Sequence, residues 1–275
     1  MSNSTSESTI ELNRESIPSL APGVYIVGAG PGDPELLTVK AQKLLMQGDV
    51  ILYADSLVPR QILQMCRPEA EIIHTANKTL EDILPVMVER VRSHKSVIRL
   101  QSGDPSLYSA IHEQMHALAA AEIPFEVIPG ISAFQAAAAK LNVELTVPGL
   151  VQTIILCRIS GRTQVPEREE LASLAAHQAS LCLYLAARHV ESAQSQLLAH
   201  YPPETPVAIC FRLGWEDEKI CVTTLDKMAE TTHKEQLIRT TLYVISPALG
   251  EVTARSRLYH PEHTHLFRPK QKLNP

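Results

Sequence analysis

The sequence lacks any apolar run approaching the roughly 20 residues that a membrane-crossing helix needs. Residues 1–22 are polar, acidic and rich in serine and threonine, without the basic start and apolar run of a secretory signal. The five cysteines include no CxxC pair, which disfavours both a disulfide framework and a zinc site. We therefore expect a cytoplasmic protein with reduced structural thiols, no bound metal and no membrane contact.

An excess of positive charge is also absent, because the formal net charge is −5. This balance argues against non-specific binding to nucleic acid. A few clustered arginines could still hold a small anionic substrate. The length of 275 residues exceeds the size at which one hydrophobic core usually stops growing, so it predicts two domains.

Short apolar runs alternate with longer amphipathic segments, which is typical of an α/β fold with parallel or mixed sheets. The turn residues Val147-Pro148-Gly149 interrupt this pattern, so we expect α/β domains at 23–147 and 148–249 with a ligand cleft between them. Expected strands are Val24–Gly28, Val50–Tyr53, Glu71–His74, Val97–Gln101, Phe125–Ile128, Gln152–Arg158, Leu181–Leu185, Val207–Arg212, Lys219–Val222 and Thr241–Ile245.

Helices are expected in the longer segments, among them Leu36–Gln47, Leu80–Ser93 and Leu107–Ala121. Thr79 and Asp82 have the spacing of a capping box at the start of the second of these.

Two tails are predicted to flank the domains. Residues 1–22 are expected to be a disordered arm, and residues 250–275 a basic tail. His260, His263 and His265 lie in that second tail, but their spacing matches no metal site.

Three loops that contain glycine follow expected strands of the first domain. They are Gly28–Pro34, Ser102–Ser106 and Pro129–Ala133. Each lies outside the carboxyl end of a strand, where open α/β sheets bind ligands. Asp104 could accept hydrogen bonds from ribose hydroxyls or a cationic amino group, or it could simply cap the following helix.

The first loop also resembles part of a dinucleotide-binding fingerprint, because Asp55 follows the second strand where a ribose-binding acid would stand. Two details argue against that interpretation. The third glycine comes one position early, with Asp33 in the sixth place, and Pro31 removes an N–H donor that a pyrophosphate would need. An NAD-dependent oxidoreductase remains an alternative hypothesis, as does a catalytically silent regulatory binder.

From about Gly23 to Leu249 the chain resembles the tetrapyrrole methylases. The first loop carries the signature of that family, and three further runs resemble the branch that methylates C11 of precorrin-4. These runs are Tyr53–Val58, Gly161–Thr163 and Trp215–Lys219. Other tetrapyrrole C-methyltransferases, of the C17, C20 or uroporphyrinogen-III type, remain alternatives.

The resemblance implies methyl transfer from S-adenosylmethionine to C11 of precorrin-4 or cobalt-precorrin-4 in cobalamin biosynthesis, with S-adenosylhomocysteine as product. It further implies a homodimer, and a cofactor folded between the two domains. The cofactor-binding residues it implies are Gly103, Asp104, Leu107, Ser132, Ala133, Tyr184, Leu185, Leu213, Thr241 and Leu242.

The same resemblance implies that the first loop faces the polycarboxylate tetrapyrrole substrate, through Gly30, Pro31, Gly32 and Asp33. Acetate and propionate groups pair well with arginine, so we expect substrate contacts from the cleft arginines. The candidates are Arg158, Arg162 and Arg212, with Arg60 and Arg188 as further possibilities. Asp33 is the candidate catalytic residue, because it could orient pyrrole N–H groups or move a proton, although it could equally cap the next helix.

Overall fold

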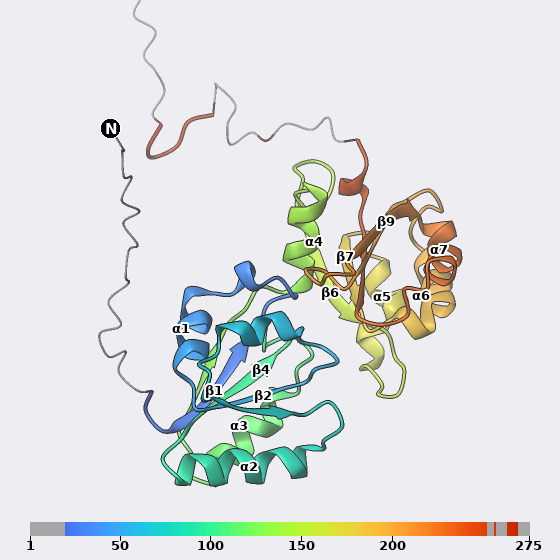
Figure 1. Cartoon of the computed structure of the whole chain (residues 1–275). Coiled ribbons are helices and arrows are strands. Elements are labelled where there is room, and N and C mark those ends of the chain that lie inside the picture. The colour runs from blue at the N-terminus through green and yellow to red at the C-terminus, as the bar shows by residue number, and fades with distance from the viewer. Residues whose placement is uncertain (1–19, 252–255, 257–262, 269–275) are drawn as a thin grey trace, which may run out of the picture.

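The computed structural model describes residues 20–251, 256 and 263–268. Most of the predicted N-terminal arm and basic tail, including His260, lies outside the described residues. The described chain forms two five-stranded sheets with helices packed on them, which confirms the expected α/β class. Figure 1 shows the two halves, with the first in blue to green and the second in yellow to red-orange.

The first sheet is parallel throughout and has the strand order β3-β2-β4-β1-β5. Its strands are β1 Gly23–Gly28, β2 Val50–Tyr53, β3 Glu71–His74, β4 Ser96–Gln101 and β5 Phe125–Ile128. Because β4, β1 and β5 are neighbours, the three glycine loops that follow them leave the same edge of the sheet.

Helices cover both faces of this sheet. One face packs against α1 (Val39–Gln47), and the other packs against α2 (Leu80–Arg92) and α3 (Ile111–Ala120) (Figure 1). The Thr79–Asp82 capping box is confirmed, since Thr79 N donates to Asp82 Oδ2 at 2.9 Å and Asp82 N donates to Thr79 Oγ1 at 3.3 Å.

Two expected helices are shorter than predicted. The segment expected to be one helix from Leu36 is a 3-10 helix at Pro34–Leu36 followed by α1, because Thr38 caps α1. The helix expected from Leu107 begins only at Ile111, because Tyr108 and Ala110 have φ angles of 55° and 49°. Such angles do not continue a right-handed helix.

The second sheet is mixed and has the order β6-β7-β10-β8-β9. Its strands are β6 Ile154–Arg158, β7 Ser180–Tyr184, β8 Pro206–Phe211, β9 Lys219–Thr224 and β10 Thr241–Ile245. Only β6 and β7 are parallel; the other three pairings are antiparallel.

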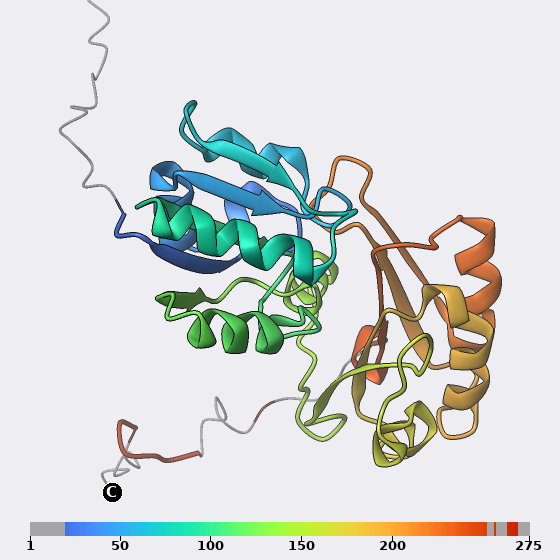
Figure 2. The same cartoon turned by 90° about the horizontal axis from the view of Figure 1, so that it is seen from below.

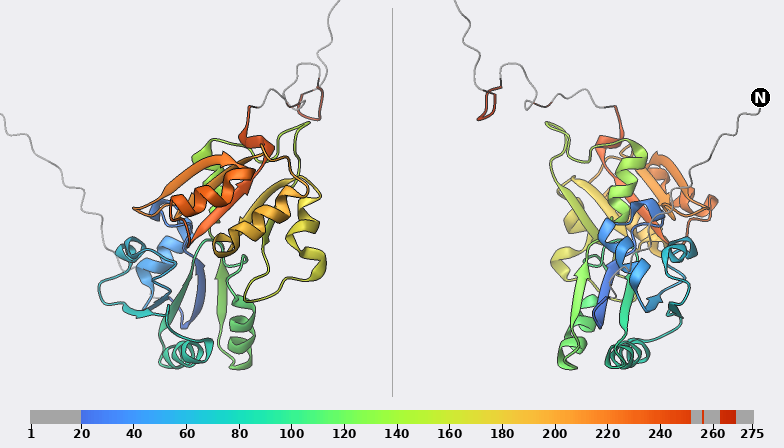
Figure 3. Two further views of the ribbon diagram at one scale, coloured as in Figure 1. Left: turned by 90° about the vertical axis from the view of Figure 1, so that its right-hand side faces the viewer. Right: turned by 60° about the vertical axis from the view of Figure 1, so that its left-hand side comes forward.

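The helix α4 (Ala133–Leu141) follows the first sheet but packs on the second. Its Ala136 and Ala137 share a core with Cys182 of β7 and Val244 of β10. The opposite face is covered by α5 (Leu171–Ala175), α6 (Val190–Leu198) and α7 (Met228–Lys234). Figures 2 and 3 show α4 at the junction, so this helix ties the two halves together.

Short 3-10 helices fill the remaining connections, at Arg60–Met65, Glu167–Glu169, Ala187–His189, Leu225–Lys227 and Pro247–Leu249. Cys157, Cys182 and Cys210 are buried in strands, and all five cysteines are free thiols. Within the described ranges, no helix is long and apolar enough to cross a bilayer, and no group of three or more His, Cys, Asp or Glu side chains could hold a metal.

Candidate functional site

The three glycine loops pack directly on one another at the carboxyl edge of the first sheet. Gly30 and Gly103 exchange two backbone hydrogen bonds, of 3.2 and 2.8 Å. A Cβ at Gly28 would lie 2.6 Å from Gly130 N, and a Cβ at Gly130 would lie 2.3 Å from Gly103 O. Gly28 and Gly130 are therefore required because the backbones of the loops touch. This requirement does not depend on a bound ligand.

Asp104 ties the second loop to the third. Its Oδ2 accepts from Gly130 N at 2.9 Å, and its Oδ1 accepts from Ser106 N at 2.8 Å and from the Ser106 hydroxyl. Burial raises the pKa of this carboxyl, but the hydrogen bonds from Ser106 and Gly130 outweigh it and leave the pKa below its usual range. The side chain is thus an anchored anion.

The first loop is held against the second half of the chain. Gln61 Nε2 donates to Gly32 O at 2.9 Å and to Gly214 O at 3.1 Å. A Cβ at Gly32 would lie 2.6 Å from Trp215 Cδ1, and a Cβ at Gly214 would lie 2.3 Å from Asp33 N. The contact has no room for a side chain at either glycine.

A cavity of about 700 Å³ lies where these loops face the second sheet. Its walls come from both halves of the chain. The described lining residues are Pro31, Ala54, Ser56, Leu57, Arg99, Gln101, Ser102, Gly103, Asp104, Leu107, Tyr108, Ser109, Ala110, Ser132, Ala133, Tyr184, Leu185, Ala187, Arg188, Cys210, Leu213, Ile238, Arg239, Thr240, Thr241 and Leu242. This size is within the range of small-molecule and cofactor sites.

The residues expected to bind the cofactor are brought together here. All ten line this one cavity, although they come from loops after β4 and β5 and from the ends of β7, β8 and β10. The structure therefore places them where one ligand could touch them all. Their individual contacts to a cofactor remain predictions.

Tyr184 joins the two sides of the cavity. Its hydroxyl lies 2.9 Å from Ser132 Oγ and accepts from Phe134 N at 3.2 Å. Its ring stands 5.4 Å from that of Tyr108 on the opposite loop, measured between centroids. Four non-glycine cavity residues, Tyr108, Ala110, Leu185 and Thr240, hold positive φ angles of 49° to 55°, so the backbone here is strained.

Most of the loop residues expected to contact the substrate do not line the cavity. Pro31 lines the cavity, whereas Gly30, Gly32 and Asp33 are not among the described lining residues. Asp33 caps the 3-10 helix at Pro34–Leu36, and its Oδ1 accepts from Glu35 N at 2.9 Å. The capping role foreseen for Asp33 is confirmed, and its catalytic role stays a prediction.

The three predicted substrate arginines lie outside the described cavity lining. Arg158 donates to Thr163 O at 2.9 Å and to Gln164 O at 2.8 Å, so it supports the loop after β6. Arg162 is exposed on that loop. Arg212 pairs with Asp217 at 2.6 Å and stacks on Trp215, with Cζ 3.9 Å from the ring centroid.

Three arginines and a glutamine also line the cavity: Arg99, Arg188, Arg239 and Gln101. Arg188 was a candidate from the sequence, but the other three were missed. The signal that could have revealed Arg99 was a charged side chain inside an otherwise apolar strand, Val97–Leu100, because such a charge is rarely buried without a partner.

The ionisable groups of the lining are poor bases at neutral pH. Burial raises the pKa of Tyr108 and of Cys210 to about 12, so both stay protonated. Burial lowers the pKa of Arg99 to about 10, which leaves it a cation. With Asp104 anionic, the described lining holds three guanidinium groups and one carboxylate.

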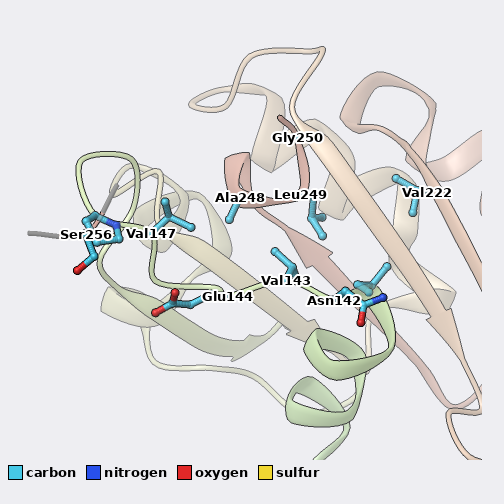
Figure 4. A pocket seen from close by; sticks show the side chains of 11 residues that line it. Asn142, Val143, Glu144, Val147, Val222, Ala248, Leu249, Gly250 and Ser256 are labelled. Atoms are coloured by element: carbon cyan, nitrogen blue, oxygen red, sulfur yellow. The ribbon is translucent and has the colours of Figure 1, made fainter. Parts of the chain in front are cut away.

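A second hollow, of about 510 Å³, lies behind the end of α4 (Figure 4). Figure 4 shows Asn142, Val143, Glu144 and Val147 on one side of it, with Ala248 and Leu249 opposite. None of the predicted site residues is among its described lining. The candidate site is therefore the larger cavity.

The chain is similar to known proteins over most of its length. The family model for tetrapyrrole (corrin/porphyrin) methylases matches residues 23–229. The cobalt-precorrin-4 C(11)-methyltransferase of Methanocaldococcus jannaschii is 43% identical over 251 residues, which are 90% of this chain and 97% of the relative. The precorrin-4 C(11)-methyltransferase of Pseudomonas aeruginosa is 42% identical over 247 residues, 90% and 98% of the two chains.

Solved structures agree with these relatives. The crystal structure of a cobalt precorrin-4 methyltransferase is 40% identical, has a TM-score of 0.80, and the match covers 83% of this chain and 96% of that one. A uroporphyrin-III C-methyltransferase from Thermus thermophilus, complexed with S-adenosylhomocysteine, is 28% identical with a TM-score of 0.70 over 82% and 98% of the two chains. This chain therefore belongs to the tetrapyrrole (corrin/porphyrin) methylases.

Proposed function

We propose that this chain transfers a methyl group from S-adenosylmethionine to C11 of precorrin-4 or cobalt-precorrin-4 in cobalamin biosynthesis. The observation that carries the proposal is that all ten predicted cofactor residues line one cavity between the two sheets. The names of the relatives support the choice of C11 over the C17, C20 and uroporphyrinogen-III alternatives. Family membership disfavours the NAD-dependent alternative.

The cavity residues fit S-adenosylmethionine in size and chemistry. Leu107, Leu185, Leu213 and Leu242 offer apolar surface for an adenine ring. Thr241, Ser132 and Asp104 offer oxygens for hydroxyl and amino groups. When bound, S-adenosylmethionine would supply a methyl group carried on a positively charged sulfur. The sulfur would leave as a neutral thioether.

The contribution of the protein is alignment. Methyl transfer from a sulfonium is an in-line displacement, which needs the acceptor carbon about 3 to 3.5 Å from the methyl group. Tyr108 and Cys210 stay protonated, and the oxygens of Asp104 already accept hydrogen bonds. The lining therefore favours catalysis by positioning over catalysis by a strong general base.

The charge of the lining suits a polycarboxylate acceptor. Arg99, Arg188 and Arg239 outnumber the single carboxylate of Asp104, although the whole chain carries a net charge of −5. A local positive charge in an acidic protein attracts an anion selectively to that place. A tetrapyrrole with acetate and propionate side chains fits this pattern.

We also propose that the enzyme is a homodimer, as the resemblance to the family implies, and that it is cytoplasmic. The free buried thiols of Cys157, Cys182 and Cys210 suit a reducing compartment. Light scattering should give twice the mass of the chain, and a mass equal to one chain would contradict the dimer.

The test is a methyl-transfer assay with several acceptors. The purified chain is incubated with S-adenosylmethionine labelled in the methyl group and, separately, with precorrin-4, cobalt-precorrin-4, uroporphyrinogen III and precorrin-3. Label should enter precorrin-4 or its cobalt form at least about tenfold faster than the others. Faster transfer to uroporphyrinogen III would contradict the assignment of C11. If the chain binds NADH but does not bind S-adenosylmethionine, it is not a methyltransferase.

A further inference from the structure

A charged side chain is buried in the middle of the first sheet, at the cavity wall. Arg99 lies on the central strand β4 and is only 8% exposed. Its register partners are Ile26 on β1 and Leu52 on β2, both fully buried. An apolar residue would suit this position better for stability alone.

The guanidinium of Arg99 has few partners. Among the residues that the structure describes, its one hydrogen bond runs from Nη1 to Thr75 Oγ1 at 2.9 Å, and it forms no ion pair. Its Nε is buried without a hydrogen-bond partner. A buried cation in this state is unfavourable unless an anion binds it.

A second unsatisfied donor stands beside it. Gln101 lies two residues further along β4, so its side chain is on the same face of the sheet as that of Arg99. It is 9% exposed, and its Nε2 is also buried without a partner in the described chain. Both residues line the cavity of about 700 Å³.

We infer that Arg99 and Gln101 form a subsite that binds a carboxylate inside this cavity. A guanidinium with free Nε and Nη donors is suited to a carboxylate, and the amide of Gln101 adds an N–H donor on the same side. The inference rests on the proposed function, because that function brings carboxylates to the cavity. They come from two sources: the acetate and propionate side chains of a tetrapyrrole, and the amino-acid end of the methyl donor.

The test uses binding, which does not depend on turnover. The variants are Arg99→Met and Gln101→Leu, which keep most of the side-chain volume but remove the donors. Arg92→Met is the matched control, because Arg92 is an exposed arginine at the C-terminal end of α2 and is not among the described lining residues of the cavity. Circular dichroism and thermal unfolding check that each variant folds.

Three probes distinguish the two sources. They are S-adenosylhomocysteine, 5′-methylthioadenosine, which lacks the amino-acid end, and uroporphyrin III, an octacarboxylate. If the bound carboxylate belongs to the tetrapyrrole, Arg99→Met should weaken uroporphyrin III binding at least about tenfold. Binding of S-adenosylhomocysteine should then stay within twofold of wild type. If the bound carboxylate belongs to the methyl donor, Arg99→Met should weaken S-adenosylhomocysteine binding by the same factor. Binding of 5′-methylthioadenosine should not change.

The inference is overturned if Arg99→Met changes no affinity by more than about twofold while Arg92→Met behaves like wild type. Stability provides an independent readout. Without ligand, Arg99→Met should unfold at the wild-type temperature or above it, because the change removes an unpaired buried charge. If Arg99→Met unfolds earlier and Gln101→Leu folds but binds all probes normally, Arg99 is structural and the subsite does not exist.

Failure of the proposed function is separable from failure of this inference. If label enters a carbon other than C11 but the Arg99→Met affinity is lost, the subsite stands and the position of methylation is wrong. If C11 is methylated and all affinities of Arg99→Met are unchanged, the subsite is wrong and the function stands.

Discussion

The hydroxyl of Tyr184 lies 2.9 Å from Ser132 Oγ, which joins the end of β7 to the start of α4 across the proposed cofactor cavity. The same hydroxyl accepts from Phe134 N at 3.2 Å. One side chain from the second sheet therefore completes the N-terminal turn of a helix that follows the first sheet. The shape of the cavity and the packing of the two halves depend on the same contact.

Tyr184→Phe should lower both the stability of the fold and the affinity of the cavity for S-adenosylhomocysteine. Loss of the buried hydroxyl removes two hydrogen bonds, so the free energy of unfolding should fall by about 1 to 2 kcal/mol. Affinity for S-adenosylhomocysteine should fall several-fold. Urea unfolding and calorimetry measure the two effects, and a double-mutant cycle with Ser132→Ala should show non-additivity. Additive effects would mean that the Ser132 contact contributes nothing.

The contact between Gly214 and Asp33 should tolerate no side chain. Gly214 and Gly149 have the same φ of 77°, but a Cβ at Gly214 would lie 2.3 Å from Asp33 N, whereas a Cβ at Gly149 meets nothing within 4 Å. Gly149→Ala should thus cost about 1 kcal/mol from the backbone alone. Gly214→Ala should cost a further 1 to 3 kcal/mol, roughly, from overpacking. Equal losses in urea unfolding would show that the two halves separate easily at this loop.

Asp104 should make stability depend on acid pH. Its folded pKa is below the unfolded value of about 3.9, because the hydrogen bonds from Ser106 and Gly130 outweigh burial. The stabilisation by the carboxylate is therefore complete above the unfolded pKa and is lost as pH falls through the folded pKa. Asp104→Asn should be less stable than wild type at pH 7, and the difference should shrink near pH 3.

Urea unfolding at a series of pH values measures this difference. Glu204→Gln, which changes an exposed acid, is the charge control. A gap between Asp104→Asn and wild type that stays constant between pH 7 and pH 3 would contradict the assignment.

Asp33→Asn separates a chemical role of Asp33 from a capping role. Asparagine caps helices about as well as aspartate, so the fold should persist. Since the carboxylate already accepts from Glu35 N and is not among the described lining residues, we expect kcat within about threefold of wild type. A fall of about 100-fold with normal stability would instead establish the catalytic role that the sequence suggested.

Much of the fold could be predicted from local pattern. The ten strands were expected close to their observed positions, because each is a short run rich in apolar and β-branched residues that is bounded by turn residues. The Thr79–Asp82 capping box was also expected and is present. The helix predicted from Leu107 was too long, because apolar periodicity cannot reveal the positive φ angles of Tyr108 and Ala110.

The candidate site was only partly predictable. The residues predicted to bind the cofactor lie at or near the ends of strands, and all ten line one cavity. The substrate arginines were harder, since whether a guanidinium meets a ligand or a loop carbonyl depends on tertiary contacts. Arg158 donates to Thr163 O and Gln164 O, whereas Arg99, hidden in an apolar strand, lines the cavity.

The most direct measurement is ¹³C NMR of the product formed from precorrin-4 and S-adenosylmethionine labelled with ¹³C in the methyl group. The cavity and the family together predict one new labelled methyl per ring, bonded to C11, with S-adenosylhomocysteine released in equal amount. A labelled methyl at another ring carbon, or an unlabelled ring beside an active control methyltransferase, would contradict the proposed function.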